Sequence, residues 1–132
     1  MKENMVQKVI MVKKIKLNKK LVFCFDIDNT ICKTIGNDYK KSLPIKKNIK
    51  SINYLHKKGH HIKIFTSRYM GRTKSNLTLA KKLGYKKTLS QLKSWGLSFD
   101  ELIMGKPRFD VYVDDKNLNF KSNWAENIDN NY

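Results

Sequence analysis

The chain is poor in cysteine, proline and acidic residues. Its 132 residues include two cysteines and two prolines, and 11 acidic residues stand against 28 lysines and arginines. Cys24 and Cys32 cannot form a framework of several disulfides, and no CxxC pair points to zinc. No repeat and no Pro/Gly/Ser-rich linker divides the chain, which at 15.5 kDa has the size of one domain. We therefore predict a single domain over residues 1–132.

Long apolar runs are missing as well. No stretch approaches the ~20 apolar residues of a membrane helix, and the lysine-rich N-terminus lacks the apolar centre of a secretory signal. We therefore expect a cytoplasmic protein without a membrane partner. Residues 1–18 are a candidate N-terminal arm, and the sequence leaves the conformation of the Asn-rich residues 118–132 open.

Arginine is scarce within the large basic excess. The formal net charge is +17, yet it comes from 25 lysines and 3 arginines, with 13 asparagines beside them. Nucleic-acid surfaces commonly use arginine, so this bias indicates A/T-rich codon usage more than a nucleic-acid interface. A positive field still concentrates phosphorylated molecules. Small anionic substrates are the favoured partners, and nucleic acid stays open.

Apolar runs alternate with helical patterns along most of the chain. Four runs predict strands, at residues 20–25, 60–65, 99–104 and 109–113. Three helical patterns, each ended by a glycine, lie between them at residues 44–58, 73–83 and 89–95. Possible anchors follow in the tail: Leu118, Phe120 and Trp124. Such alternation predicts an α/β fold, a mostly parallel sheet with helices on both faces.

Polar side chains follow three of the predicted strands. Asp26, Thr66 and Asp114 each stand at a carboxyl end, the edge where open α/β sheets bind ligands. Turn capping could explain one or two of these positions. It leaves the acidic pairs unexplained, because Asp28 and Asp115 add further carboxylates beside Asp26 and Asp114.

The two acidic pairs predict a bound cation that offsets their mutual repulsion. Like charges a few ångströms apart oppose one another's ionisation, and Mg²⁺ accepts carboxylates while leaving room for a phosphate oxygen. Lys106 supplies a fixed positive charge, and Thr66 and Ser67 supply hydroxyl and backbone donors. Phosphoryl transfer needs this combination, because its catalysis is mostly positioning and charge stabilisation.

Four motifs, FDIDNT, IFTSR, GKP and VYVDD in that order, resemble those of the haloacid dehalogenase superfamily of phosphohydrolases, over residues 20–117. The resemblance implies a Rossmann-like core and a Mg²⁺ cofactor. It makes Asp26 the nucleophile and Asp28 the general acid/base, both also metal ligands. It further makes Thr66 the phosphate-binding residue of the second motif and Lys106 the lysine of the third, both catalytic. Asp114 becomes the acidic metal ligand, which Asp115 supports through water or as a second ligand.

Asp28 and the short intervals between motifs narrow the resemblance. The superfamily's dehalogenases lack an acid at the Asp28 position, so the resemblance favours a phosphatase. The intervals leave no room for a large cap domain. The chain therefore looks like a capless member and resembles the keto-deoxy-octulosonate phosphatase group. In addition, the segment RYMGR at residues 68–72, followed by QLKSWG, resembles small phosphatases of capsule and lipopolysaccharide gene clusters. Candidate substrate-binding residues are Thr30, Ser67, Arg68 and Arg72. The two arginines could equally be solvated charges on an exposed turn.

The leading hypothesis is a Mg²⁺-dependent phosphomonoesterase acting on a phosphorylated sugar or related metabolite of surface-polysaccharide synthesis. The alternatives are a nucleic-acid end phosphatase, for which the basic charge argues, and a catalytically silent domain that binds a partner. Because an open site gains from exclusion of water, we also expect a homo-oligomer, a tetramer or dimer, whose subunits partly cover one another's sites.

Overall fold

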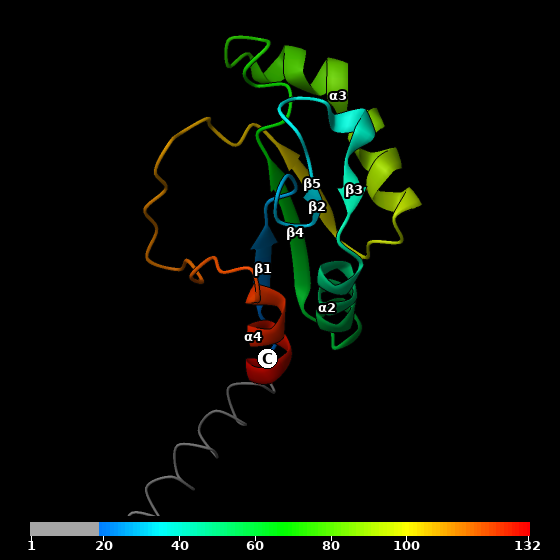
Figure 1. Ribbon diagram of the computed structural model, residues 1–132, viewed down its shortest axis with the longest axis vertical. Helices are drawn as coiled ribbons and strands as arrows, with labels where there is room; N and C mark the ends of the chain where they lie inside the picture. Colours follow the sequence, from blue (N-terminus) through cyan, green and yellow to red (C-terminus); the bar gives the residue numbers. More distant parts are fainter. Residues whose placement is uncertain (1–18) are drawn as a thin grey trace, which may run out of the picture.

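The structure, a computed structural model, describes residues 19–132 (Figure 1). Three parallel strands, β1 (Val22–Phe25), β4 (His61–Thr66) and β5 (Glu101–Met104), form a sheet in the order β1-β4-β5. They coincide with the first three predicted strands, and the α/β architecture fits a Rossmann-like fold. The candidate arm of residues 1–18 lies outside the described residues.

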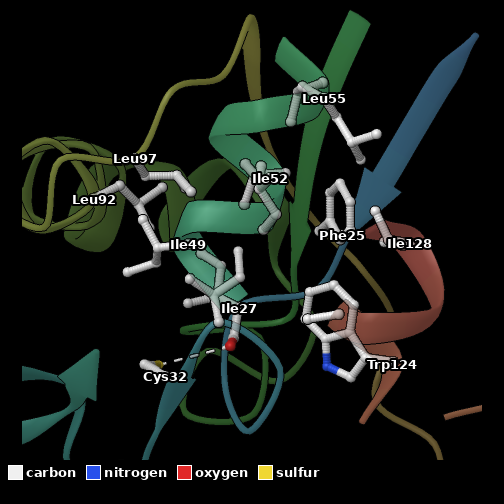
Figure 2. Close-up of a cluster of buried hydrophobic side chains, with 14 of the residues drawn as sticks. Phe25, Ile27, Cys32, Ile49, Ile52, Leu55, Leu92, Leu97, Trp124 and Ile128 are labelled. Atoms are coloured by element: carbon white, nitrogen blue, oxygen red, sulfur yellow. Dashed lines mark hydrogen bonds between the residues drawn. The ribbon is translucent and has the colours of Figure 1, made fainter. Parts of the chain in front are cut away.

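Helices α2 (Lys46–Lys57), α3 (Leu77–Ser94) and α4 (Trp124–Asn131) contribute to one hydrophobic core (Figure 2). Their buried residues share one cluster with Phe25, Ile64 and Leu102 of the three strands, so the helices pack on one face of the sheet. The opposite sheet face, which carries Val22, Cys24 and Lys63, holds no buried side chain. The prediction of helices on both faces is therefore wrong for residues 19–132.

Gly84 does not end a helix, contrary to the prediction. It lies inside α3, which is one continuous helix and begins where the Asn76 side chain accepts the Leu79 N–H at 3.0 Å. A Cβ on Gly84 would come within 2.1 Å of Cδ2 of Tyr69. The glycine therefore allows the Tyr69 ring to lie against the helix backbone, a tertiary reason that helix propensity does not reveal.

The predicted strand at residues 109–113 is absent from the described structure. These residues lie in an exposed loop between β5 and α4, which Figure 1 shows swinging wide of β1. The edge of β1 that faces away from β4 has no strand beside it among residues 19–132. Of the predicted tail anchors, Leu118 and Phe120 are exposed, whereas Trp124 is buried and its ring centroid lies 5.6 Å from that of Phe25.

A small hairpin that the sequence did not predict joins β1 to α2. Strand β2 (Cys32–Lys33) pairs antiparallel with β3 (Leu43–Pro44), and the 3-10 helix η1 (Tyr39–Lys41) lies between them. Two-residue strands are too short to show a periodic pattern. The hairpin places η1 near the carboxyl end of the sheet. Within residues 19–132, no helix has the length and apolar character needed to cross a bilayer.

Candidate active site

Three strand ends bring together residues that are distant in the sequence. Asp26 directly follows β1, Thr66 ends β4, and Lys106 comes two residues after β5. The Lys106 ammonium lies 3.7 Å from Oδ2 of Asp26, and the Lys106 N–H donates to the Thr66 carbonyl at 3.1 Å. Gly105 makes the turn between β5 and Lys106 with φ of 97°, a region that favours glycine. The structure thus brings three of the predicted residues together.

The carboxylate of Asp26 is incompletely compensated. Burial raises its pKa, while the Lys106 charge and the Ile27 N–H, which donates to Oδ1 at 2.8 Å, lower it in part. The balance leaves the pKa above its ordinary value because desolvation is the largest effect. A further positive charge beside Asp26 would therefore be favourable.

Asp28 is engaged by a buried arginine that the sequence analysis had placed on the substrate. The Arg68 side chain is 1% exposed, and it donates to Oδ2 of Asp28 from Nε at 2.9 Å and to Oδ1 from Nη2 at 2.8 Å. The Thr34 hydroxyl also donates to Oδ1, at 2.6 Å. Arg68 therefore does not present its guanidinium to solvent, and Asp28 is held in a defined orientation.

The other residues predicted to bind phosphate, Thr66, Ser67 and Thr30, are buried or half-buried and form hydrogen bonds with backbone groups. Thr66 is fully buried, and its hydroxyl oxygen accepts the Arg68 N–H at 3.1 Å. Ser67 is half-buried at the start of the following turn, where its carbonyl accepts the Met70 N–H. Thr30 is half-buried in the turn after Asp28 and donates its N–H to the Ile27 carbonyl. Their role toward a phosphate stays a prediction.

Arg72 differs from Arg68 because it is exposed. Its guanidinium lies over the rings of Tyr39 and Tyr69, 5.3 and 4.6 Å from their centroids, and it donates to the Asn37 carbonyl at 3.0 Å. The contacts join the loop before η1 to the loop after β4. Arg72 is thus the solvent-exposed member of the two arginines predicted to bind substrate, and its role toward an anionic group stays a prediction.

Asp114 and Asp115 do not join the other carboxylates. Both are exposed on the loop after β5, where Oδ1 of Asp114 accepts the Lys116 N–H at 3.0 Å, a bond that lowers the Asp114 pKa. Among residues 19–132, no three His, Cys, Asp or Glu side chains lie close enough to hold a metal ion. The donor chemistry of Asp26 fits Mg²⁺, but the described arrangement gathers only part of the predicted set.

Several residues near Asp28 are not among the predicted site residues. Gln91 of α3 accepts from Nη1 of Arg68 at 2.6 Å and donates to the Tyr39 carbonyl at 2.7 Å. The Arg68 guanidinium also lies over the Tyr39 ring, 4.7 Å from its centroid. Gln91 begins the QLKSWG segment, but the sequence gives no sign that Gln91 or Tyr39 contacts Arg68, so only the tertiary structure identifies these contacts.

The cysteines have environments that do not favour reactivity. Desolvation raises the thiol pKa of both the solvent-accessible Cys24 and the buried Cys32, which keeps them protonated near neutral pH. Among the histidines, His60 is buried, and desolvation lowers its pKa. Its Nδ1 accepts the Leu21 N–H at 3.0 Å, a structural contact at the opposite end of β1 from Asp26.

Comparison with known proteins gives a likeness of fold. No protein-family model and no curated protein matches the chain. The crystal structure of a structural-genomics target from Vibrio cholerae superimposes with a TM-score of 0.70 at 22% identity, covering 83% of this chain and 96% of that one. At this identity the likeness bears on the fold alone. This chain therefore shares an α/β fold with a protein known by its structure.

Proposed function

We propose that this chain is a Mg²⁺-dependent phosphomonoester hydrolase that forms an aspartyl-phosphate on Asp26. The observation that supports the proposal is the meeting of Asp26, Thr66 and Lys106 at the carboxyl edge of a parallel sheet. A carboxylate facing a fixed ammonium offers a nucleophile beside a positive charge that can stabilise phosphoryl oxygens.

The proposed reaction has two displacements at phosphorus. First, an Asp26 oxygen forms a bond to phosphorus while the ester P–O bond breaks, and the leaving oxygen takes a proton from the Asp28 carboxyl group. Then a water oxygen bonds to phosphorus as it gives a proton to Asp28, and the bond to Asp26 breaks. Free enzyme, alcohol and phosphate result, and one acid/base group serves both steps.

Magnesium is part of the proposal. Asp26, the Asp28 carbonyl and Asp114 would hold the ion, with Asp115 in support, and the ion would supply positive charge opposite the phosphoryl oxygens. The open edge of β1 supports this assignment, because pairing of residues 109–113 with that edge would bring Asp114 toward Asp26. The exposed side chains of Val111 and Val113 would gain burial in the process.

The substrate proposed is a small phosphorylated sugar or related metabolite of surface-polysaccharide synthesis in the cytoplasm. Exposed Arg72, next to Tyr39 and Tyr69, supports recognition of a second anionic group on it. The decisive experiment is a panel of phosphorylated metabolites assayed with Mg²⁺ and with EDTA, with Asp26→Asn as the control. Mg²⁺-dependent phosphate release that Asp26→Asn lacks is expected. If no compound releases phosphate, the phosphatase proposal fails and the alternative of a catalytically silent binding domain is favoured.

A phosphatase of nucleic-acid ends is the second candidate. It is favoured by the absence of any acidic residue from 39 to 99 in the sequence, a span that includes many lysines. End-phosphorylated oligonucleotides in the same panel separate the candidates. Binding through phosphate contacts would weaken steeply with added salt. Preference for an oligonucleotide over every sugar phosphate would replace the first candidate by the second.

Homo-oligomerisation, as a dimer or tetramer, is proposed to close the site. The exposed position of Arg72 and of the loop after β5 supports it, because the described residues leave this end of the sheet open. Light scattering at assay concentration is the test. A monomer with full activity on a small sugar phosphate would contradict the closure by a neighbouring subunit.

A further inference from the structure

The two oxygens of the Asp28 carboxylate have unequal surroundings. Oδ1 accepts from Nη2 of Arg68 at 2.8 Å, from Nε of Arg68 at 3.2 Å and from the Thr34 hydroxyl at 2.6 Å. Oδ2 accepts from Nε of Arg68 alone, at 2.9 Å. A carboxylate oxygen has two lone pairs, so Oδ1 is saturated while Oδ2 keeps acceptor capacity.

The arginine is itself held from several sides. Nη1 donates to Gln91 at 2.6 Å, and the guanidinium lies over the Tyr39 ring. Thr34, the second donor to Asp28, is fixed by a 2.6 Å hydrogen bond to Ser42 of the hairpin. Every part of the arrangement thus restricts rotation of the Asp28 carboxyl group.

Stability alone does not account for such an arrangement. Charged groups lose hydration when buried, and apolar residues of similar volume commonly stabilise a protein as well or better than a buried ion pair. A planar guanidinium fork does what an apolar group cannot, because it sets the plane of a carboxylate. The effect of the Arg68 guanidinium that calls for an explanation is therefore the fixed orientation of the Asp28 carboxylate.

We infer that Arg68 is a positioning residue which, together with the Thr34 hydroxyl, occupies Oδ1 of Asp28 and leaves Oδ2 as the oxygen that exchanges protons with substrate and water. The inference rests on the proposed function. In the first displacement the proton leaves Oδ2 for the departing alkoxide as the Asp26–phosphorus bond forms and the ester bond breaks. In the second, Oδ2 receives the proton of the attacking water as the Asp26–phosphorus bond breaks.

The test uses two esters that differ in their need for a proton. The alkoxide of glycerol 2-phosphate must be protonated as it leaves, whereas the nitrophenolate of p-nitrophenyl phosphate departs without help. Arg68→Lys keeps the charge and loses the planar fork. We expect it to lower kcat/KM at least 10-fold more for glycerol 2-phosphate than for p-nitrophenyl phosphate. Equal losses on both esters would overturn the inference, because a general weakening of the fold does not distinguish leaving groups.

Thr34→Val provides the same test without disturbing the arginine. Its matched control is Thr88→Val, since Thr88 is also a buried threonine but its hydroxyl has no hydrogen-bond partner within the described chain. Thr34→Val should show the leaving-group dependence and Thr88→Val should not. Should Arg68→Lys fail to fold, the Thr34→Val comparison decides the question alone.

A double-mutant cycle separates this inference from the proposed function. In an Asp28→Asn background, Arg68→Lys should cause no further selective loss on glycerol 2-phosphate, because both changes act through the same group. A selective loss that adds fully would refute the positioning role while the phosphatase proposal stands. If the wild type hydrolyses neither ester and no compound of the metabolite panel, the proposed function is refuted, and the positioning role with it.

Discussion

Lys106 and Asp26 face each other across the carboxyl edge of the sheet, with the ammonium 3.7 Å from Oδ2 of the carboxylate. The lysine is carried there by β5 and the aspartate by β1, with β4 between them. Even so, the pKa of Asp26 stays above its ordinary value, because burial outweighs the attraction of the lysine. Lys106 therefore does not fully compensate the burial of the Asp26 carboxylate, and the pH dependence of stability can measure the remaining cost.

Replacing Asp26 should separate activity from stability. The raised pKa means that the folded state holds the Asp26 proton more tightly than the unfolded state, so stability falls as pH rises from the unfolded pKa through the folded one. Asp26→Asn removes this cost, so we expect no turnover and a Tm above that of wild type at pH 7. The gain should shrink as pH falls through the Asp range. Thermal unfolding at several pH values checks it, and wild-type hydrolysis by the variant would rule out the covalent mechanism.

Lys106→Met should have the opposite effect on stability. Without the ammonium, the pKa of Asp26 rises further, so the variant should lose more stability at pH 7 than at acid pH. Phosphate release should fall by about 100-fold, the order expected for one stabilising group in an active site. The exposed residue Lys81 offers the control Lys81→Met. A loss of stability independent of pH would show that Lys106 acts by packing and not by charge.

Asp28→Asn should slow both halves of the reaction. One group is proposed to protonate the leaving oxygen and to take the proton of water, so the amide impairs each step. Rapid-quench measurement of phospho-enzyme, with an alkyl phosphate as substrate, resolves formation from breakdown. Formation and breakdown both at wild-type rates would remove Asp28 from the mechanism. Far-ultraviolet circular dichroism verifies the fold, since the change leaves the buried Arg68 without its carboxylate.

The cysteines can report on the loop after β5. Cys24 is exposed and Cys32 is buried, so iodoacetamide should modify Cys24 alone in the native protein. The charges of Lys106 and Asp114 act on the Cys24 thiol, which places this loop within electrostatic range of it. If Mg²⁺ draws Asp114 toward Asp26, alkylation of Cys24 should slow with Mg²⁺ in wild type and stay unchanged in Asp114→Asn. An equal rate of Cys24 alkylation with and without Mg²⁺ in the wild type would contradict the proposed movement of Asp114 toward Asp26.

Gly84→Ala should destabilise the protein despite placing a better helix former in α3. Alanine is favoured over glycine by about 1 kcal/mol in an open helix. At this position its Cβ would meet the Tyr69 ring at 2.1 Å, and overpacking of this kind costs about 1–3 kcal/mol. We expect a net loss in urea unfolding, whereas Ser90→Ala on the exposed side of the same helix should be neutral or stabilising. A gain from Gly84→Ala would show that the loop bearing Tyr69 yields readily.

The sequence was most informative where chemistry and local pattern coincide. Asp26 and Thr66 stand directly after apolar runs, so their meeting at one sheet edge followed from parallel topology. The partnership of Arg68 with Asp28 could not be predicted, because it depends on how the turn after β4 faces the hairpin after β1. The same limit applies to Gly84, because the close approach of the Tyr69 ring to this position of α3 is a tertiary contact.

The apolar run at residues 109–113 shows a different limit. Its composition is typical of a strand, but a strand forms only when it pairs with the edge of another strand. Composition alone does not show whether such pairing occurs. In the described structure, the run and the open edge of β1 stay apart. The placement of Asp114 and Asp115 as metal ligands therefore stays a prediction, whereas the convergence of Asp26, Thr66 and Lys106 is found.

Tyr39 links the surface proposed for anion binding to the proposed proton donor. Tyr39 begins η1, and its ring lies against the exposed Arg72 and also against the buried Arg68, the partner of Asp28. A molecule that displaces Tyr39 would therefore disturb the proposed proton donor as well as the proposed binding surface. Poor substrates should be discriminated by slow turnover as much as by weak binding, so selectivity would appear in kcat. A specificity screen by affinity alone would overlook it.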